Sequence, residues 1–215
     1  LQGSGTIDFL ESSSISKLLT FLPDSTIGIA QFSNKRKVTE VEFPEANSPA
    51  ALISYQPKLG VLKVSSYKDQ LISMFDKDIT LKGTLILQKS GATGSGLIQF
   101  KEASLEAKAF NFNHEEIDSE NANFALKNRF TSFGENPLAI QSDGVKSHVS
   151  FKERSGVFNS SGSKRIKFPA NNYYCQMDKF IWQMDGEAID FEKNGNGETS
   201  FESDADLVAN NFFSM

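Results

Sequence analysis

Apolar and polar residues alternate through the middle of the chain, and this pattern predicts a series of β-strands. The runs Thr84–Leu87 and Leu97–Phe100 alternate, and apolar positions resume over Leu105–Phe112. A period of two places successive side chains on opposite faces of a strand, whereas a helix repeats its apolar positions every three or four residues. Three glycines interrupt the pattern and predict a hairpin turn between the first two runs: Gly91, Gly94 and Gly96.

Similar strand-like segments recur along the rest of the chain, separated by Gly, Pro, Asn and Ser. They include 5–10, 26–32, 38–43, 61–64, 145–151 and 173–182. Tyr67–Phe75 is the best helix candidate because its apolar residues are four apart, although a strand or a covering loop fits nearly as well. We predict an all-β protein of antiparallel strands, forming an elongated, twisted, open jellyroll-like or solenoid-like repeat array with at most one or two short helices.

The alternation changes phase twice in the central segment. Ile98 and Phe100 occupy even positions, Leu105 and Ala107 odd positions, and Phe110 and Phe112 even positions again. A shift of one residue turns the core face of a strand toward solvent, unless an extra residue is accommodated in a bulge. We therefore predict bulges near Glu102 and near Ala109.

The chain contains an internal repeat. Residues 3–21 align without a gap with residues 94–112, and nine of the nineteen aligned positions are identical. The match continues at Asp24–Ser25 with Asp118–Ser119, and a weaker third copy begins near Gly197, with Phe201 and Phe213 in it. Self-similarity of this kind indicates repeated structural units. The alternative is one domain with two similar hairpins.

The repeat predicts an organisation into a partial copy with a connecting region (1–79), a central copy (80–196) and the start of a further copy (197–215), all within one continuous structural unit. Because the chain begins and stops inside copies, we interpret it as an internal piece of a longer protein, whose targeting signal lies outside it. Neighbouring repeats of the parent chain are then its expected partners. Strand edges exposed at both ends could also pair with another copy.

Composition narrows the functional classes. The net charge is −5 over 215 residues, which argues against a phosphate-binding face for nucleic acid. Phenylalanine dominates the aromatic residues with nineteen copies against one tryptophan, in keeping with a β-rich core. The single cysteine, Cys175, excludes an internal disulfide.

Residues that could carry chemistry are few. His114 and His148 are 34 residues apart without Cys or acidic partners at metal-binding spacing, so we interpret them as surface residues. Glu115 and Glu116 with Asp190 could form a glycosidase pair, and Asp185–Glu187 and Asp204–Asp206 resemble parts of calcium loops, but no pattern is completed. We predict no enzymatic activity, no catalytic residues, no cofactor and no metal.

Aromatic residues offer the one candidate contact surface. A strand over Tyr174–Trp182 would place Tyr174, Phe180 and Trp182 on one face. These side chains either pack in a core or form a platform for a sugar or lipid. The candidate contact or core aromatics are Phe100, Phe110, Phe112, Tyr174, Phe180 and Trp182.

The segments Gly83–Leu87, Gly94–Phe100, Ala103–Phe112 and Ile117–Leu126 resemble the repeats of the OstA-like superfamily, which includes the periplasmic bridge and outer-membrane assembly proteins of lipopolysaccharide transport. The resemblance covers residues 80–127, with an echo at 3–32. It implies an open, twisted β-jellyroll whose interior binds acyl chains. The longer repeat and the segment Tyr173–Trp182 depart from that pattern. The whole chain also resembles internal segments of very large envelope proteins of Gram-negative bacteria, which implies a periplasmic, outer-membrane-associated or secreted location.

Two functional hypotheses follow. The first is a non-enzymatic envelope segment that acts as a structural scaffold or as a conduit for lipid or lipopolysaccharide acyl chains. The second is a carbohydrate-binding or carbohydrate-processing β-domain of a cell-surface system. A conduit would line a continuous groove with Phe, whereas a sugar-binding domain would expose Tyr or Trp beside polar residues.

Overall fold

The computed structural model describes residues 1–127, 138–160, 165–171, 173–186, 189–192 and 201–203. Within them the chain forms seventeen β-strands in one sheet and one short 3-10 helix, which confirms the predicted all-β class. The elements are β1 (Gln2–Phe9), β2 (Ser12–Phe21), β3 (Thr26–Asn34), β4 (Ala46–Gln56), β5 (Val61–Ser66), β6 (Ile72–Met74), β7 (Ile79–Gln88), β8 (Gly91–Phe100), β9 (Ala103–Phe112), β10 (Glu116–Lys127), β11 (Leu138–Ser150), β12 (Ser155–Asn159), β13 (Ile166–Phe168), η1 (Pro169–Asn171), β14 (Tyr173–Cys175), β15 (Lys179–Gln183), β16 (Ile189–Glu192) and β17 (Phe201–Ser203).

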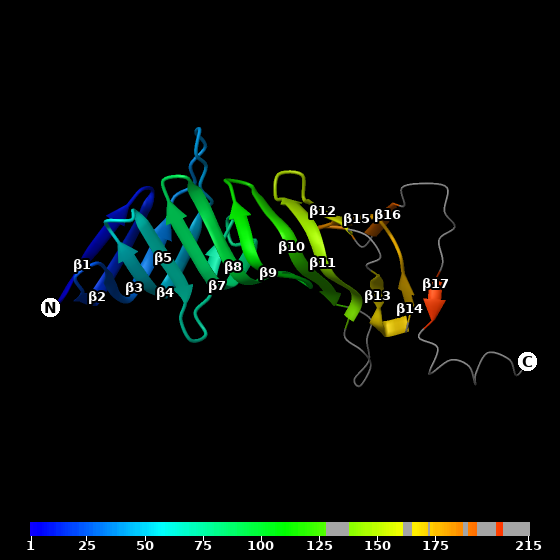
Figure 1. Cartoon of the computed structure of the whole chain (residues 1–215), viewed down its shortest axis with the longest axis horizontal. Helices are drawn as coiled ribbons and strands as arrows, with labels where there is room; N and C mark the ends of the chain where they lie inside the picture. The colour runs from blue at the N-terminus through cyan, green and yellow to red at the C-terminus, as the bar shows by residue number, and fades with distance from the viewer. Residues whose placement is uncertain (128–137, 161–164, 172, 187–188, 193–200, 204–215) are drawn as a thin grey trace, which may run out of the picture.

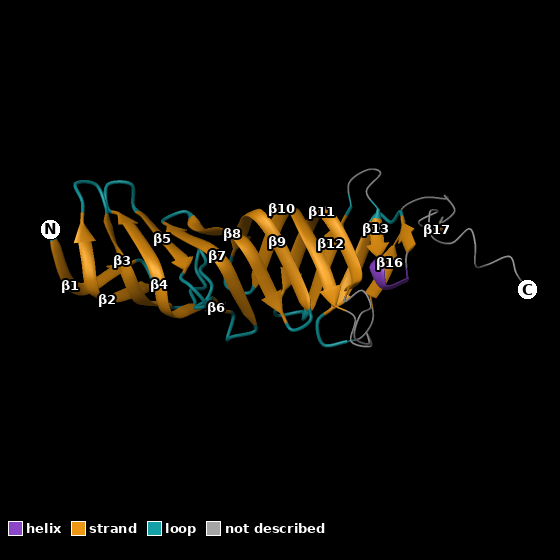
Figure 2. Cartoon of the chain, turned by 90° about the horizontal axis from the view of Figure 1, so that it is seen from below, coloured by secondary structure: helices purple, strands orange, loops and turns teal. Residues whose placement is uncertain are grey.

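The strands form an antiparallel meander in which most of them pair with the next strand in the chain. Figure 1 shows the resulting elongated shape, with β1 at one end, β17 toward the other and the strands running across the long axis. Figure 2 shows the connecting loops gathered along the two long edges of the sheet. Hairpins between sequence neighbours explain this layout, because short turns permit only antiparallel pairing.

At two positions along the meander, which we call its interrupted levels, two short strands take the place of one long strand. β5 and β6 both lie between β4 and β7, and β12 and β13 both pair with β11. Between β5 and β6 the chain makes a tight turn in which Tyr67 and Gln70 exchange backbone hydrogen bonds of 3.1 and 3.0 Å. The helix candidate Tyr67–Phe75 is therefore this turn followed by β6. Its four-residue spacing of apolar side chains results from the turn and not from helical periodicity.

The sheet buries one face along its length. Inward-facing side chains of the described strands join a single hydrophobic cluster, which extends from Leu19 to Met184. Phe75, in the turn after β6, stacks on Phe151, in the turn after β11, with ring centroids 4.3 Å apart. Contacts of this kind show that the inner face of the sheet closes on itself around one core.

Strands β1–β4, which we call the first copy, have the same pairing as β8–β11, the second copy. Gly5 pairs with Ser16 in the first copy, and Gly96 pairs with Ala107 in the second, so both partners are 91 residues further along the chain. Phe9 and Phe100 end their strands at equivalent positions and face the core, as the repeat predicts. The first hairpins of the two copies thus have the same hydrogen-bond register, whereas β2–β3 has a register shift that β9–β10 lacks.

The same irregularities also recur. Between the equivalent pairs, β2 and β9 each contain one extra residue, at Lys17–Leu18 and at Lys108–Ala109. The bulge predicted near Ala109 is therefore confirmed. The bulge predicted near Glu102 is wrong. The phase changes there because Lys101 and Glu102 form the turn between β8 and β9.

Further along the copies the predicted alignment needs a correction. Thr20 pairs with Ile27, and Asn111, 91 residues after Thr20, pairs with Asp118. Asp118 therefore takes the place of Ile27, and the predicted match with Asp24–Ser25 is wrong. The region of the proposed third copy, apart from the backbone of β17, lies outside the described residues.

The glycine-rich segment was predicted as a hairpin turn, but it lies inside β8. Gly96 pairs with Gly83 on β7, and its φ is +125°, in a region that residues with a side chain rarely adopt. A Cβ at Gly96 would approach the carbonyl oxygen of Lys82 to 2.4 Å. Glycine is therefore required here by close contact between two strands and not by a reversal of the chain.

Two other predicted strands differ from the structure. Val38–Phe43 belongs to a long hairpin loop after β3 that is closed by an isolated bridge between Lys37 and Phe43. Its alternating Val and Glu residues reflect this exposed loop. The segment Tyr174–Trp182 is interrupted at residues 176–178, so that it forms the end of β14 and most of β15.

Candidate functional site

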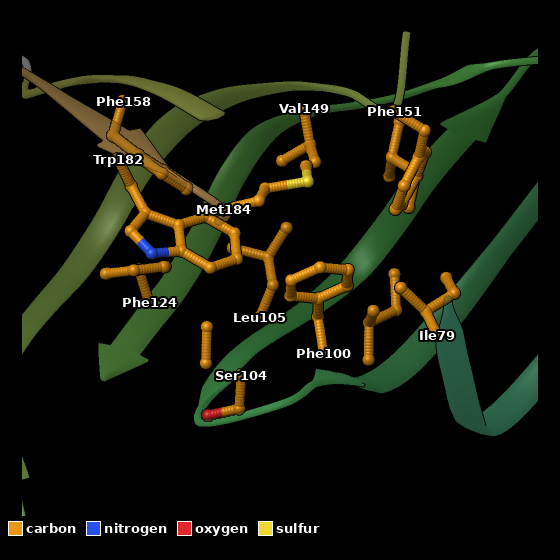
Figure 3. Close-up of a pocket in the computed structure, with 13 residues that line it drawn as sticks. Ile79, Phe100, Ser104, Leu105, Phe124, Val149, Phe151, Phe158, Trp182 and Met184 are labelled. Carbon is orange, nitrogen blue, oxygen red and sulfur yellow. The ribbon is translucent and has the colours of Figure 1, made fainter. Parts of the chain in front are cut away.

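The inner face is filled by aromatic side chains from strands that are distant in sequence. Phe100 contacts Trp182 edge-on, with ring centroids 5.4 Å apart, and Phe124 lies 4.4 Å from Phe158. Figure 3 shows these rings converging on a pocket between β8, β10, β12 and β15. The cavity measures about 20 Å³ and its lining is almost entirely apolar. It has room for roughly one water molecule, whereas ligand pockets usually measure about 300–1,000 Å³.

The candidate aromatics separate into core residues and one surface residue. Five of them are less than 9 % exposed and belong to the core cluster: Phe100, Phe110, Phe112, Phe180 and Trp182. Tyr174 is half-buried on β14, and the guanidinium of Arg165 lies 4.6 Å from its ring centroid. The break between β14 and β15 changes the phase, because Cys175 and not Tyr174 points inward. The predicted common face of Tyr174, Phe180 and Trp182 is therefore wrong.

An apolar hollow lies on the outer face of the first copy, across β1–β4. It is an open groove of about 840 Å³, which we call the apolar groove. Five aliphatic side chains that line it are between 36 % and 57 % exposed: Ile15, Leu18, Ile27, Ile29 and Leu52. Lys17 is the charged residue in this lining.

The register explains why these side chains gather. Ile29 on β3 pairs with Leu52 on β4, and Ile27 pairs with Thr20 on β2. The extra residue at Lys17–Leu18 bends β2 and increases its twist, as bulges do, so that the outer face becomes concave at this point. Aliphatic residues on three adjacent strands therefore line one hollow.

The second copy has an equivalent hollow of about 490 Å³ with a different lining. Glu106 and Ala109 stand where the first copy has Ile15 and Leu18, as the common register of β2 and β9 shows. Asp118 and Lys146 stand at the positions of Ile27 and Leu52, and β10 has two polar residues, Glu120 and Asn121, where β3 has Ile29. The backbone thus produces the hollow, and the sequence of the first copy makes it apolar.

Charged side chains connect turns that are far apart in the chain. Arg154, in the turn before β12, forms ion pairs with Asp78 and with Asp185, and the latter distance is 2.8 Å from Nε to Oδ2. Lys101 also reaches Asp185, at 2.8 Å. Hydrogen bonds from Arg154 and Lys101 hold the pKa of the Asp185 carboxyl well below its usual range. This network has no counterpart at Leu10, the equivalent of Lys101 in the first copy.

Both histidines have acidic partners that their spacing in the sequence did not indicate, although His148 lies on the surface as predicted. Nδ1 of His114 lies 2.6 Å from Oε2 of Glu42, in the long loop after β3. Nδ1 of His148 on β11 lies 2.8 Å from Oδ1 of Asp118 on β10, and Glu116 is close to both. Pairing between strands creates these contacts, so no spacing along the sequence could have indicated them.

The other candidate acids are separated or occupied. Glu115 forms ion pairs with Arg36 and His114, whereas Asp190 lies on β16, four strands further along the sheet from β10. Asp185 is bound by Arg154 and Lys101. The other acidic residues of the two calcium-loop candidates, Glu187, Asp204 and Asp206, lie outside the described residues.

Comparison with protein-family models, with curated protein sequences and with solved structures finds no match to this chain. Among the described residues, no helical segment has the length and apolar character needed to cross a membrane.

Proposed function

We propose that the chain is a non-enzymatic β-scaffold of a bacterial cell envelope that holds the acyl chain of an anionic lipid in the apolar groove of its first copy. The observation that carries this proposal is the difference between the two copies. The equivalent hollow is lined by large aliphatic side chains in the first copy and by polar side chains with two alanines in the second, so the fold alone does not require the aliphatic lining.

The location of the ligand differs from that implied by the OstA-like resemblance, where acyl chains lie inside the jellyroll. Here the interior cavity beside Phe100 and Trp182 is about 20 Å³, while the groove outside measures about 840 Å³. The groove is thus in the size range of ligand sites, and the cavity is far below it. A lipid would therefore lie along the outer face.

Charge favours an anionic headgroup. Lys17 stands at the groove, although the chain as a whole carries a net charge of −5. Aliphatic walls can take up the apolar chain, and an ammonium group can pair with a carboxylate or phosphate at its end. A carbohydrate would need exposed rings beside polar groups, and the candidate rings other than Tyr174 are buried.

The test is a titration with a dansyl-labelled fatty acid, followed by fluorescence. The variant Leu18→Ala with Ile29→Asn gives the groove the residues of the second copy and should weaken binding by at least about tenfold, because two walls of the groove are lost. Lys17→Glu should weaken binding of the fatty acid but not of its methyl ester. Lys108→Glu, at the equivalent position of the second copy, is the matched control and should bind as the wild type does.

Absence of binding to the wild-type chain, or equal binding by the groove variant, would contradict the lipid part of the proposal. Light scattering distinguishes one further outcome. If the wild type is a dimer and the groove variant is a monomer, the groove is covered by a second copy of the chain and not by lipid.

A further inference from the structure

We propose that Glu116, Asp118 and His148 form a binding site for a divalent transition metal such as Zn²⁺ on the outer face of the second copy. Each of these residues offers one ligand atom, and the three atoms lie within 4.8 Å of one another. Imidazole and carboxylate groups are established zinc ligands. The site is separate from the apolar groove and does not depend on its function.

Strand geometry brings the three side chains together. Asp118 on β10 pairs directly with His148 on β11, and Glu116 is two residues before Asp118. Residues i and i+2 of a strand share a face, and directly paired residues have Cβ atoms about 4.5–5.5 Å apart. Two long strands in the middle of the sheet therefore hold the three groups on the same face.

The distances suit a metal after small side-chain adjustments. Nδ1 of His148 and Oδ1 of Asp118 are 2.8 Å apart. Two ligands bound tetrahedrally to Zn²⁺ at about 2.1 Å each would be roughly 3.4 Å apart. The pair would open slightly and Glu116 would move closer, which rotation of exposed side chains allows.

Neighbouring residues orient the ligand side chains and give the site a net negative charge. Nδ2 of Asn113 donates a hydrogen bond of 2.8 Å to Oε2 of Glu116, which leaves Oε1 of that carboxylate for a metal. Outer contacts of this type orient metal ligands. Lys146 on β11 forms a 2.8 Å ion pair with Glu120 and also interacts with Asp118. The carboxylates of Glu116, Asp118 and Glu120 exceed the single positive charge of Lys146 by two negative charges, which attracts a divalent cation.

The ligands are accessible and specific to the second copy. The side chains of Asp118 and His148 are 49 % and 44 % exposed, so an ion can enter from solvent and keep water in its remaining positions. In the first copy the equivalent residues are Ile27 and Ser54, which pair in the same way but cannot bind a metal. The acidic and imidazole groups therefore belong to the second copy, although the corresponding residues of the first copy pair in the same way.

The experiment is isothermal titration of the untagged chain with ZnCl₂, in parallel with CaCl₂. We expect one Zn²⁺ per chain and little heat with Ca²⁺, because imidazole is a poor ligand for calcium. His148→Ala and Asp118→Asn should each weaken Zn²⁺ binding by at least about tenfold. Both positions are exposed, so circular dichroism of the variants should match the wild type.

His114→Ala is the matched control, because His114 is also flanked by carboxylates, but they contact opposite ring nitrogens and one of them is paired with Arg36. It should bind Zn²⁺ as the wild type does. The proposal is overturned if the wild type shows no Zn²⁺ binding at roughly 1 mM metal. It is also overturned if His148→Ala binds as tightly as the wild type, or if His114→Ala is the variant that loses binding.

Discussion

The first and second copies share the register of their first hairpin, but β2 and β9 distribute polarity in opposite ways. On β2 the inward positions are Ser12, Ser14 and Ser16, whereas on β9 the equivalent positions are Ala103, Leu105 and Ala107. On the outer face the first copy is aliphatic and the second is charged or amide-bearing. The pairing of the strands therefore does not depend on which face is the more apolar.

The two copies derive their stability from different sets of buried side chains. The second copy buries large side chains in the common core, such as Phe100, Phe110 and Phe124. The first copy buries fewer large side chains, such as Leu19, Phe32 and Ile53, and leaves other aliphatic side chains in water. Burial of apolar area is the main favourable contribution to folding, so the second copy should be the more stable part of the sheet.

Truncation of equivalent phenylalanines should show this difference most strongly. Phe100→Ala should reduce the free energy of unfolding by about 3–5 kcal/mol, because the ring is buried against Trp182 and Phe151. Phe9→Ala should cost roughly half as much, because that ring is only half-buried against Tyr55. Urea denaturation measures both values, and equal losses would remove the proposed contrast between the copies.

Equivalent glycines should respond differently to a methyl group. Gly96→Ala should cost about 2–4 kcal/mol, because a positive φ and a contact with the carbonyl of Lys82 both oppose a Cβ. A Cβ at Gly5 would meet no atom within 4 Å, so Gly5→Ala should change stability by less than about 1 kcal/mol. Thermal unfolding of the two variants gives the comparison, and a larger loss for Gly5→Ala would contradict the close approach of β7 and β8.

The smallest effect is expected at the inner serines of the first copy. The hydroxyl of Ser14 is buried and has no hydrogen-bond partner among the described residues, so Ser14→Ala should raise stability by up to about 1 kcal/mol. Ser12 is its control, because its hydroxyl donates to the carbonyl of Phe9 at 2.6 Å and Ser12→Ala should lower stability by about 1 kcal/mol. Chemical denaturation resolves the sign, and a loss at Ser14 would indicate that its hydroxyl has a partner.

The strand content and the repeat could be predicted from the sequence because both depend on local pattern. Alternation predicted the strands around Phe100 and Phe112, and the shift of phase predicted the bulge at Ala109. The sequence was less informative about which face of each strand points toward the core. A period of two shows that Ile27 and Ile29 share a face, but it does not show that Ala30 and Phe32 are the residues that point inward.

Features that depend on pairing between strands could not be predicted. The contact between Asp118 and His148 depends on the register of β10 against β11, which three irregularities alter along its length. The sequence predicts a turn at Gly96, because it does not reveal that the backbone of Lys82 lies close by. The spacing of Tyr67 and Leu71 is compatible with a helix, and only the backbone pairing of Tyr67 with Gln70 shows that the chain turns there.

The meander has a mechanical consequence. Its strands run across the long axis, and each is hydrogen-bonded mainly to the strand that follows it (Figure 1). Tension applied between the two ends of such a chain opens the hydrogen bonds of one strand pair at a time, as in a zipper, instead of shearing many pairs together. The interrupted levels at β5–β6 and β12–β13 are exceptions, because two short strands there are attached to shared neighbours. Under load the molecule should therefore lengthen in steps at low force, with pauses at these two levels.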